Sequence, residues 1–441
     1  MHRFLAAVSA AALLPFGPAG AQVSTPATPM VGTPATPAPV GPPPPAPATD
    51  LPLLVPRQGP LPADITLQQA LEEAEARSPA IIAAQARVDA AAARIRQAGY
   101  RFNPDLSVQV ENFLGSGQLS GIRQSEATVS VNQRLDLSGR RRSLLATAEA
   151  AFASERLRLA ISRADLAQAV RQQFARAVSA RERLRIAQEN EANARELARI
   201  AGILVQEGRD PPLRGVRARS AAAQAAAELE AARAEEVSAR GTLAALFGVS
   251  EPPASVVGSL LDAPAQAVDP RRSLEVRLAE AERLRGEAEV RSQVAQGRID
   301  PAVGVGVRYV RETGDYALLG GVSMPLRIFN RNQGNIAAAE ADVRAAEANL
   351  ANTTASVEVR TRNAIIGVEA AQARVQALES AGVPEASEAL RLAQLSYREG
   401  RATLLELLDA QNAYRNAQLA LVDARLALAN ATAELGRVAA Q

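Results

Sequence analysis

Two acidic residues near the C-terminal end, Glu406 and Asp409, have the spacing that most favours a chemical role. They are three positions apart in a segment rich in Leu and Ala, so on a helix they share one face. Paired carboxylates attract cations, and carboxylates are also the groups that this chain has available for acid–base chemistry. The ordinary alternative is a solvated helix face, because Glu and Asp are common surface residues.

The rest of the side-chain inventory argues against catalysis. The sequence contains no Cys, and its single His is His2, inside a segment typical of export signals. Without that segment the chain lacks the imidazole and thiolate groups of a Ser-His triad or an ordinary zinc or copper site. It has no Lys, and therefore no Gly-x-x-x-x-Gly-Lys nucleotide loop. We expect no enzymatic activity, no cofactor and no metal site, and the net charge of +2 does not favour nucleic-acid binding.

The N-terminal 63 residues combine an export signal with a linker. A positive charge at Arg3, an apolar run and the small-x-small sequence Ala19-Gly20-Ala21 assign residues 1–21 to a signal peptide. No Cys lies near the cleavage site, so lipidation is not expected. Residues 22–63 are rich in Pro and Ala and cannot bury a core, which predicts a disordered, extended linker. An arm that wraps a surface or spans the cell wall is the alternative.

The remaining sequence consists of two similar halves, residues 64–262 and 263–441. Each half is expected to contain a helix, a β-hairpin and two further helices, as in a duplicated unit. The second-half apolar series continues every seven residues to Leu378, a period typical of helices packed as coiled coils. We therefore expect long helices packed into a bundle or tube. The first-half residues Leu145, Phe152, Leu159 and Leu166 correspond to Ile336, Val343, Leu350 and Val357.

Each half also contains two segments in which apolar and polar residues alternate. This pattern fits either a half-buried soluble sheet or a membrane barrel. Two isolated hairpins have exposed edges, whereas hairpins pooled from several subunits into a closed barrel have none. We therefore favour an oligomeric transmembrane β-barrel continued by an all-α coiled-coil tunnel. The predicted strands are about 103–113 and 125–137 in the first half, and about 301–311 and 315–328 in the second.

Two further segments make the chain resemble a known family. One runs from Met324 to Asn335 (MPLRIFNRNQGN) before an Ala-rich helix. The other runs from Tyr397 to Gly400 (YREG) and is followed by ELLDA, which begins at Glu406. With these segments the chain resembles the outer-membrane factors, the TolC-like efflux ducts, and among them the CzcC-like ducts for heavy-metal cations. The resemblance covers roughly residues 64–438.

The resemblance implies a homotrimer in the outer membrane with a periplasmic helical tunnel. Each subunit would contribute four strands to a twelve-stranded barrel in contact with outer-membrane lipid. The implied function is passive conduction of heavy-metal cations from an inner-membrane RND pump, through a periplasmic adaptor (a membrane fusion protein), to the exterior. A multidrug or type I secretion duct is the nearest alternative. A periplasmic coiled-coil scaffold or adaptor without a pore is the alternative of another class.

The same resemblance assigns roles at the periplasmic tip, the narrow end of such ducts. Glu406 and Asp409 would form a pore ring of carboxylates in the trimer. Gly208, Arg214, Tyr397 and Gly400 would form the tip turns or the gate. Arg214 stands where the second half has Glu406, and it could either pair across the tip with Glu406 or Asp409 or remain exposed and unpaired.

Overall fold

The computed structural model describes residues 57–260 and 269–440. The expected signal peptide, residues 1–21, and the expected linker up to residue 56 lie outside the described residues. None of the helices in the described part combines the length and apolar character that a membrane span requires.

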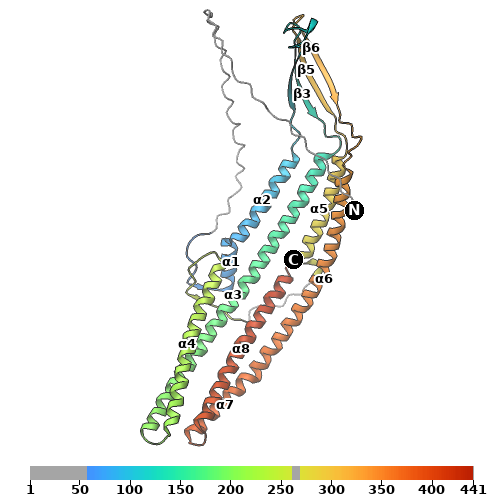
Figure 1. Ribbon diagram of the computed structural model, residues 1–441. Helices are drawn as coiled ribbons and strands as arrows, with labels where there is room; N and C mark the ends of the chain where they lie inside the picture. Colours follow the sequence, from blue (N-terminus) through green and yellow to red (C-terminus); the bar gives the residue numbers. More distant parts are fainter. Residues whose placement is uncertain (1–56, 261–268, 441) are drawn as a thin grey trace, which may run out of the picture. The chain divides into compact units, whose positions relative to one another are not determined.

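Long helices make up most of the described chain (Figure 1). The longest of them, α3, has 67 residues and therefore extends about 100 Å. In each half one or two helices precede a hairpin, and the longest helix of that half follows it directly. The first-half helices are α1 (Leu67–Arg77), α2 (Pro79–Gly99), α3 (Arg140–Gln206) and α4 (Pro212–Leu246). The second-half helices are α5 (Leu274–Gln296), α6 (Gln333–Ala377), α7 (Val383–Arg398) and α8 (Leu404–Val438).

The seven-residue apolar series lies on the covered face of α6. Every position of the series from Ile336 to Leu378 is buried or half-buried, while most residues between them are exposed. α6 packs against α5 and α8, and α3 packs against α2, α4, α5 and α8. The heptad period therefore marks the seam along which α6 meets its neighbours, as the sequence predicts.

A π-helical turn, Leu378–Gly382, separates α6 from α7, whereas α3 runs without interruption. Pro384 explains the turn, because proline has no N–H and its ring clashes with the carbonyl four residues earlier in an α-helix. The Val383 N–H donates instead to the Leu378 carbonyl, five residues back. The wider turn accommodates the proline without ending the helical path.

A four-stranded antiparallel sheet joins the two hairpins. Its order is β2 (Asp105–Glu111), β3 (Glu126–Arg134), β5 (Ala302–Val310) and β6 (Asp315–Ser323), so β3 and β5 connect the halves. β2 and β6 are its edges. The strands are shorter than predicted: β6 ends at Ser323 rather than near residue 328, just before Pro325, which cannot donate a ladder hydrogen bond.

A compact apolar core lies where α1, α3 and α4 meet. Phe174 and Phe247 are almost fully buried in it. Two-residue strands β1 (Asp64–Ile65) and β4 (Ser255–Val256) pair in parallel beside it. Arg181 of α3 donates to the carbonyls of Val256 and Gly258 and so ties this small sheet to the long helix. Strands of two residues are too short to show a period in the sequence.

Candidate functional site

The α3–α4 and α7–α8 helical hairpins each reverse at a left-handed glycine. Gly208 has a φ of +71° and Gly400 a φ of +75°. Each turn carries the two hydrogen bonds of a Schellman motif. A side chain at either position would be strained, because L-residues disfavour this conformation. The bonds are Gly208 N–H to Val205 O (3.1 Å), Arg209 N–H to Leu204 O (2.9 Å), Gly400 N–H to Tyr397 O (3.0 Å) and Arg401 N–H to Ser396 O (2.9 Å).

An apolar cluster holds the two hairpins together just behind these turns. It contains buried residues of α3, α4 and α8, with the partly buried Tyr397 of α7 packed against it. Gly215 at the start of α4 allows close approach to α3, since a Cβ there would lie 3.3 Å from Val205 Cγ2. The buried members of the cluster are Leu197, Ala201, Ala218, Leu404 and Leu407.

Glu406 caps the first turn of α8. Its Oε2 accepts the Thr403 N–H at 2.6 Å and the Thr403 hydroxyl at 3.1 Å, while the Glu406 N–H donates to Thr403 Oγ1 at 3.3 Å. This reciprocal arrangement is a capping box. The bonds from the Thr403 backbone and hydroxyl hold the pKa of the Glu406 carboxyl below its usual value. The Thr-x-x-Glu spacing of Thr403 and Glu406 is the signal in the sequence that predicts this box.

Asp409 is exposed, as is Glu406, whereas Leu404 and Leu407 are buried against the other hairpin. The two carboxylates therefore lie on the outward face of α8. Within the described chain Asp409 has no ion-pair partner. Asp409 is therefore free to face water or another copy of the chain, whereas the exposed Glu406 carboxylate is bonded to Thr403 through Oε2.

Arg214 pairs with Asp210, not with Glu406 or Asp409, and it is not unpaired either. The reason is local: Asp210 precedes the two prolines that start α4, four positions before Arg214, which brings the two side chains onto one side. Asp210 is largely buried. Asp210 is not among the residues predicted for the site, although its spacing of four positions from Arg214 is a signal in the sequence.

Tyr397 of the second half lies against this first-half pair. Burial, and secondarily the negative charge of Asp210, raise the pKa of Tyr397, while Arg214 opposes the shift. The Tyr397 hydroxyl is buried without a hydrogen-bond partner among the described residues. The tip therefore brings together Tyr397, Asp210 and Arg214, and it leaves Glu406 in its own capping box.

The far end of the molecule carries a sheet with two contrasting faces. The register aligns Val108, Val129, Val307 and Leu318 in one row across all four strands. Their exposed fractions are 66%, 46%, 43% and 87%, so this apolar face is uncovered. Tyr309 and Tyr316 continue the face with ring centroids 5.1 Å apart. Apolar surface of this extent is typical of an interface with lipid or protein.

The opposite face of the sheet is polar. The Arg308 guanidinium donates to Glu126 at 2.8 Å and to Thr128 at 3.1 Å, and lies 3.5 Å from a Glu111 oxygen. The Ser107 and Ser130 hydroxyls lie 3.2 Å apart on the same face. The alternation expected from the sequence thus separates lipid-compatible and water-compatible faces.

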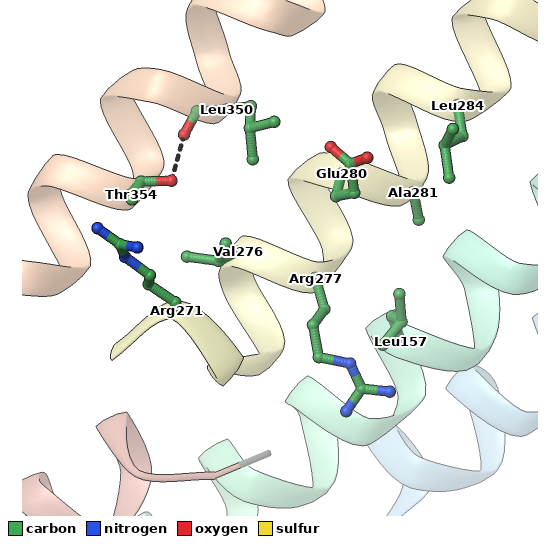
Figure 2. Close-up of a pocket in the computed structure, with 9 residues that line it drawn as sticks. All are labelled: Leu157, Arg271, Val276, Arg277, Glu280, Ala281, Leu284, Leu350 and Thr354. Atoms are coloured by element: carbon green, nitrogen blue, oxygen red, sulfur yellow. Dashed lines mark hydrogen bonds between the residues drawn. The ribbon is translucent and has the colours of Figure 1, made fainter. Parts of the chain in front are cut away.

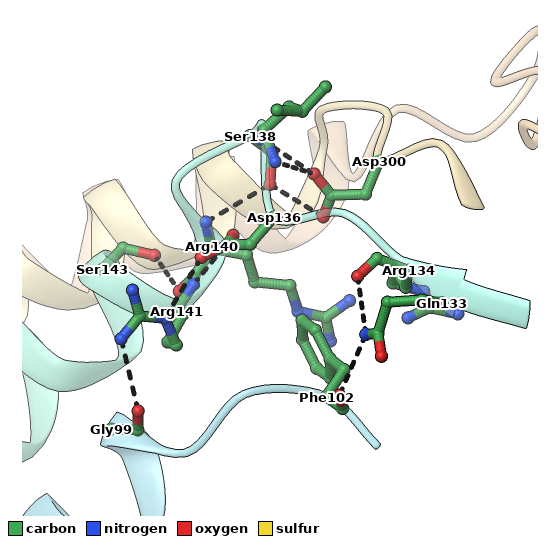
Figure 3. A network of polar contacts seen from close by, with 11 residues as sticks. Gly99, Phe102, Gln133, Arg134, Asp136, Ser138, Arg140, Arg141, Ser143 and Asp300 are labelled. Atoms are coloured by element: carbon green, nitrogen blue, oxygen red, sulfur yellow. Dashed lines mark hydrogen bonds and ion pairs between the residues drawn. The ribbon is translucent and has the colours of Figure 1, made fainter. Parts of the chain in front are cut away.

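A polar network fixes the sheet onto the helices (Figure 3). Asp300, between α5 and β5, accepts the Leu137 N–H at 3.1 Å, the Ser138 N–H at 2.8 Å and the Ser138 hydroxyl at 2.9 Å. Arg141 of α3 lies 3.6 Å from Asp136 and donates to the Gly99 carbonyl at 3.3 Å. The network joins loops of both halves where strands give way to helices.

A groove of about 530 Å³ runs along α5 between α3 and α6 (Figure 2). Leu157, Val276 and Leu350 give it a mainly apolar lining, with Arg277 and Glu280 on the α5 side. Neither the groove nor any other place in residues 57–260 and 269–440 groups three or more His, Cys, Asp or Glu side chains for a metal ion.

Long packed helices that end in glycine turns and carry an amphipathic antiparallel sheet define the class of outer-membrane efflux ducts. The chain belongs to the outer membrane efflux protein family, which matches residues 70–249 and 271–441. It is 33% identical to the nickel and cobalt resistance protein CnrC of Cupriavidus metallidurans over 68% of this chain and 73% of that one. It is 32% identical to the nickel-cobalt-cadmium resistance protein NccC of Alcaligenes xylosoxydans xylosoxydans, over 70% of each chain.

Solved structures share the fold at lower identity. The outer membrane protein VceC of Vibrio cholerae superposes with a TM-score of 0.69 at 21% identity, over 85% of this chain and 96% of that one. The MtrE outer membrane channel of Neisseria gonorrhoeae, in its open state, superposes with a TM-score of 0.71 at 20% identity, over 87% and 93%. The chain is therefore an efflux protein of the outer membrane with the helical fold of these channels.

Proposed function

We propose that three copies of this chain form an outer-membrane duct that passively conducts heavy-metal cations out of the cell. An inner-membrane RND pump supplies the energy, and a periplasmic adaptor links pump and duct. The names of CnrC and NccC, which are nickel, cobalt and cadmium resistance proteins, support metal cations as the cargo. The absence of Cys, and of any His but His2, suits a conduit that releases such cargo rather than one that holds it.

The observation that carries the proposal is the four-stranded sheet with an exposed apolar face and two edges, β2 and β6. An open sheet of this kind exposes unpaired backbone groups, which lipid cannot satisfy. If β2 of each copy pairs with β6 of the next, three sheets close into one barrel without edges. The Val108 row then faces lipid, and the face that carries Arg308 lines the water-filled lumen.

Engineered disulfides test this closure directly, because the chain contains no Cys of its own. Within one sheet β2 and β6 are three strand spacings apart, about 14 Å, whereas a disulfide needs Cβ atoms about 4 Å apart. Ser107→Cys combined in turn with Ala317→Cys, Leu319→Cys or Gly321→Cys should give a covalent trimer on a non-reducing denaturing gel for one pairing. Ser107→Cys alone is the control. Detergent-purified protein that stays monomeric, with no covalent trimer from any pairing, contradicts the barrel.

The cargo is tested in a strain that lacks the gene. Growth on graded Ni²⁺, Co²⁺, Zn²⁺ and Cd²⁺ should fail at lower concentrations than in the parent strain, and the intact gene should restore it. Tolerance of organic drugs is measured in parallel. Unchanged metal tolerance with lost drug tolerance would assign the duct to multidrug export instead.

At the periplasmic tip we propose that Glu406 and Asp409 form stacked carboxylate rings and that the Tyr397–Asp210–Arg214 group belongs to the gate. The exposure of both carboxylates on α8 supports the rings. The similar turns at Gly208 and Gly400 support an origin of residues 64–262 and 263–441 by duplication. Glu406→Gln with Asp409→Asn should lower the cation preference of the open duct in planar lipid bilayers. An unchanged cation preference would contradict the proposed carboxylate rings.

A further inference from the structure

Arg308 is at the centre of the charged residues on the polar face of the sheet. It lies on β5, yet both its carboxylate partners, Glu126 and Glu111, belong to the hairpin of the other half. Its side chain is 34% exposed, so the cluster is in contact with solvent. By strand register, the charged residues of this face are Asp105, Glu111, Glu126, Arg134, Arg308 and Asp315.

The cluster lies close to the hairpin turns. Glu111 ends β2 and Glu126 begins β3, so both flank the first turn. Arg308 is two residues before the end of β5 and therefore near the second turn. Both turns lie at the end of the sheet away from the helices (Figure 1). In a duct whose helices point into the periplasm, this end is the outer mouth.

The packing around β5 indicates that the polar face is the concave one. A Cβ at Gly304 would lie 2.1 Å from Asn132 Oδ1, and one at Gly306 would lie 2.7 Å from Ser130 Cβ. The side chains of β3 thus lean over the bare backbone of β5. The alternate positions of β5 carry valine on the apolar face. Glycine on one face and β-branched residues on the other favour bending toward the glycine face, as at the corners of barrels.

We propose that Arg308 sets the ion selectivity of the outer mouth by offsetting part of the negative charge of the barrel wall. The inference rests on the proposed barrel. Each copy contributes four carboxylates and two guanidinium groups to this face, so the wall is acidic overall. Fixed charge along a narrow water-filled passage concentrates ions of opposite sign. Arg308 offsets one of its two neighbouring carboxylates, so the mouth attracts cations but does not hold them tightly.

Reversal potentials across planar bilayers in a KCl gradient test the proposal, with KCl of at least about 0.1 M to screen distant charges. Arg308→Gln should raise the K⁺/Cl⁻ permeability ratio about two-fold, since it uncovers three charges around one passage. Glu126→Gln should lower the ratio, and the double variant should return near the wild-type value. Arg311→Gln, the same charge change in the turn beyond β5, is the matched control and should leave the ratio unchanged.

The readouts separate this inference from the proposed function. All variants must first elute as trimers in detergent, which shows that the sheet has formed without the Arg308 pairs. Conducting trimers whose ratio is the same for wild type, Arg308→Gln and Glu126→Gln overturn the role of Arg308 and leave the duct intact. A K⁺/Cl⁻ permeability ratio that changes only with Glu406→Gln and Asp409→Asn places the selectivity at the tip and also overturns the role of Arg308. Wild-type protein without conductance overturns the duct itself.

Discussion

Thr403 and Glu406 stabilise the first turn of α8 through reciprocal hydrogen bonds, and loss of these bonds should destabilise that turn. Replacing an N-cap Thr with Ala destabilises a helix start by about 1 kcal/mol, which is about a five-fold faster amide exchange. Thr403→Ala should therefore accelerate exchange at residues 403–407 of the intact protein. Thr432→Ala, in the last third of the same helix, removes a methyl group and a hydroxyl that donates to the Leu428 carbonyl but no N-cap, and it is the control. Equal effects of the two changes would contradict the capping role.

The same cap predicts a pH dependence. The bonds from Thr403 hold the pKa of Glu406 below the unfolded value of 4.5. A lowered folded pKa means that the stabilisation is complete above the unfolded value and is lost as pH falls through the folded value. Exchange protection at the start of α8 should fall below pH 4.5 in the wild type, after correction for intrinsic rates. Glu406→Gln should lack this step.

Tyr397 contributes its ring rather than its hydroxyl to the tip. Because the hydroxyl is buried without a partner in the described chain, Tyr397→Phe removes no hydrogen bond and should leave the closed tip unchanged. Tyr397→Ala deletes the ring that packs on the Leu404 cluster and should loosen the tip by about 3 kcal/mol. Basal conductance of closed ducts measures both. A leak with Tyr397→Phe would show that the hydroxyl acts, for example across two copies.

At the scale of elements, β5 depends on glycine where β3 leans over it. Gly306→Ala would place a Cβ 2.7 Å from the Val129 carbonyl oxygen and 2.7 Å from Ser130 Cβ, so it should sharply reduce the yield of detergent-stable trimer. Gly320→Ala on β6 is the matched control, because nothing lies within 4 Å of a Cβ there. Size-exclusion chromatography of both variants measures the yield. Similar yields would show that the sheet does not need the bare backbone of β5.

Two arginines fasten α8 to the α3–α4 hairpin well behind the tip. Arg183 of α3 contacts Asp423 of α8 and Glu235 of α4, and Arg415 of α8 pairs with Glu228 of α4 at 2.8 Å. Arg415→Gln should speed amide exchange along α8 by a few-fold, as expected for a partly exposed pair. Arg199→Gln, which breaks a pair with Glu196 inside α3, is the control and should spare α8.

The sequence predicts the elements better than the contacts between them. The heptad from Ile336 to Leu378 and the alternation in β5 are repeats within single segments. A repeat of this kind predicts the secondary structure of the segment and the face that it buries. The Arg308 cluster depends on the pairing of β3 with β5, whose partners are about 180 residues apart, so no local pattern announces it. The same holds for Tyr397 beside Asp210. Both sequence-based alternatives for Arg214, a pair with Glu406 or Asp409 and no partner at all, differ from its pair with Asp210 in the structure.

At the scale of the whole molecule, the two halves differ in structure at their glycine turns, and both contribute strands to one sheet. The sheet contains strands of both halves, because β3 of the first half and β5 of the second form its central pair. The tips differ: the first has the Asp210–Arg214 pair behind two prolines, and the second has the Thr403–Glu406 box. A symmetric sheet and asymmetric turns would suit the proposed duct, in which the sheet end stays closed into a barrel and the glycine-turn end opens.

The uncovered strands β2 and β6 also have a genetic consequence. If every copy pairs with one neighbour through β2 and with the other through β6, one defective copy disrupts a trimer that contains two intact copies. A cell that makes equal amounts of intact and edge-defective chain would then keep only about one eighth of its assemblies wholly intact. Such a mutant allele should be dominant-negative, whereas a deletion allele should be recessive.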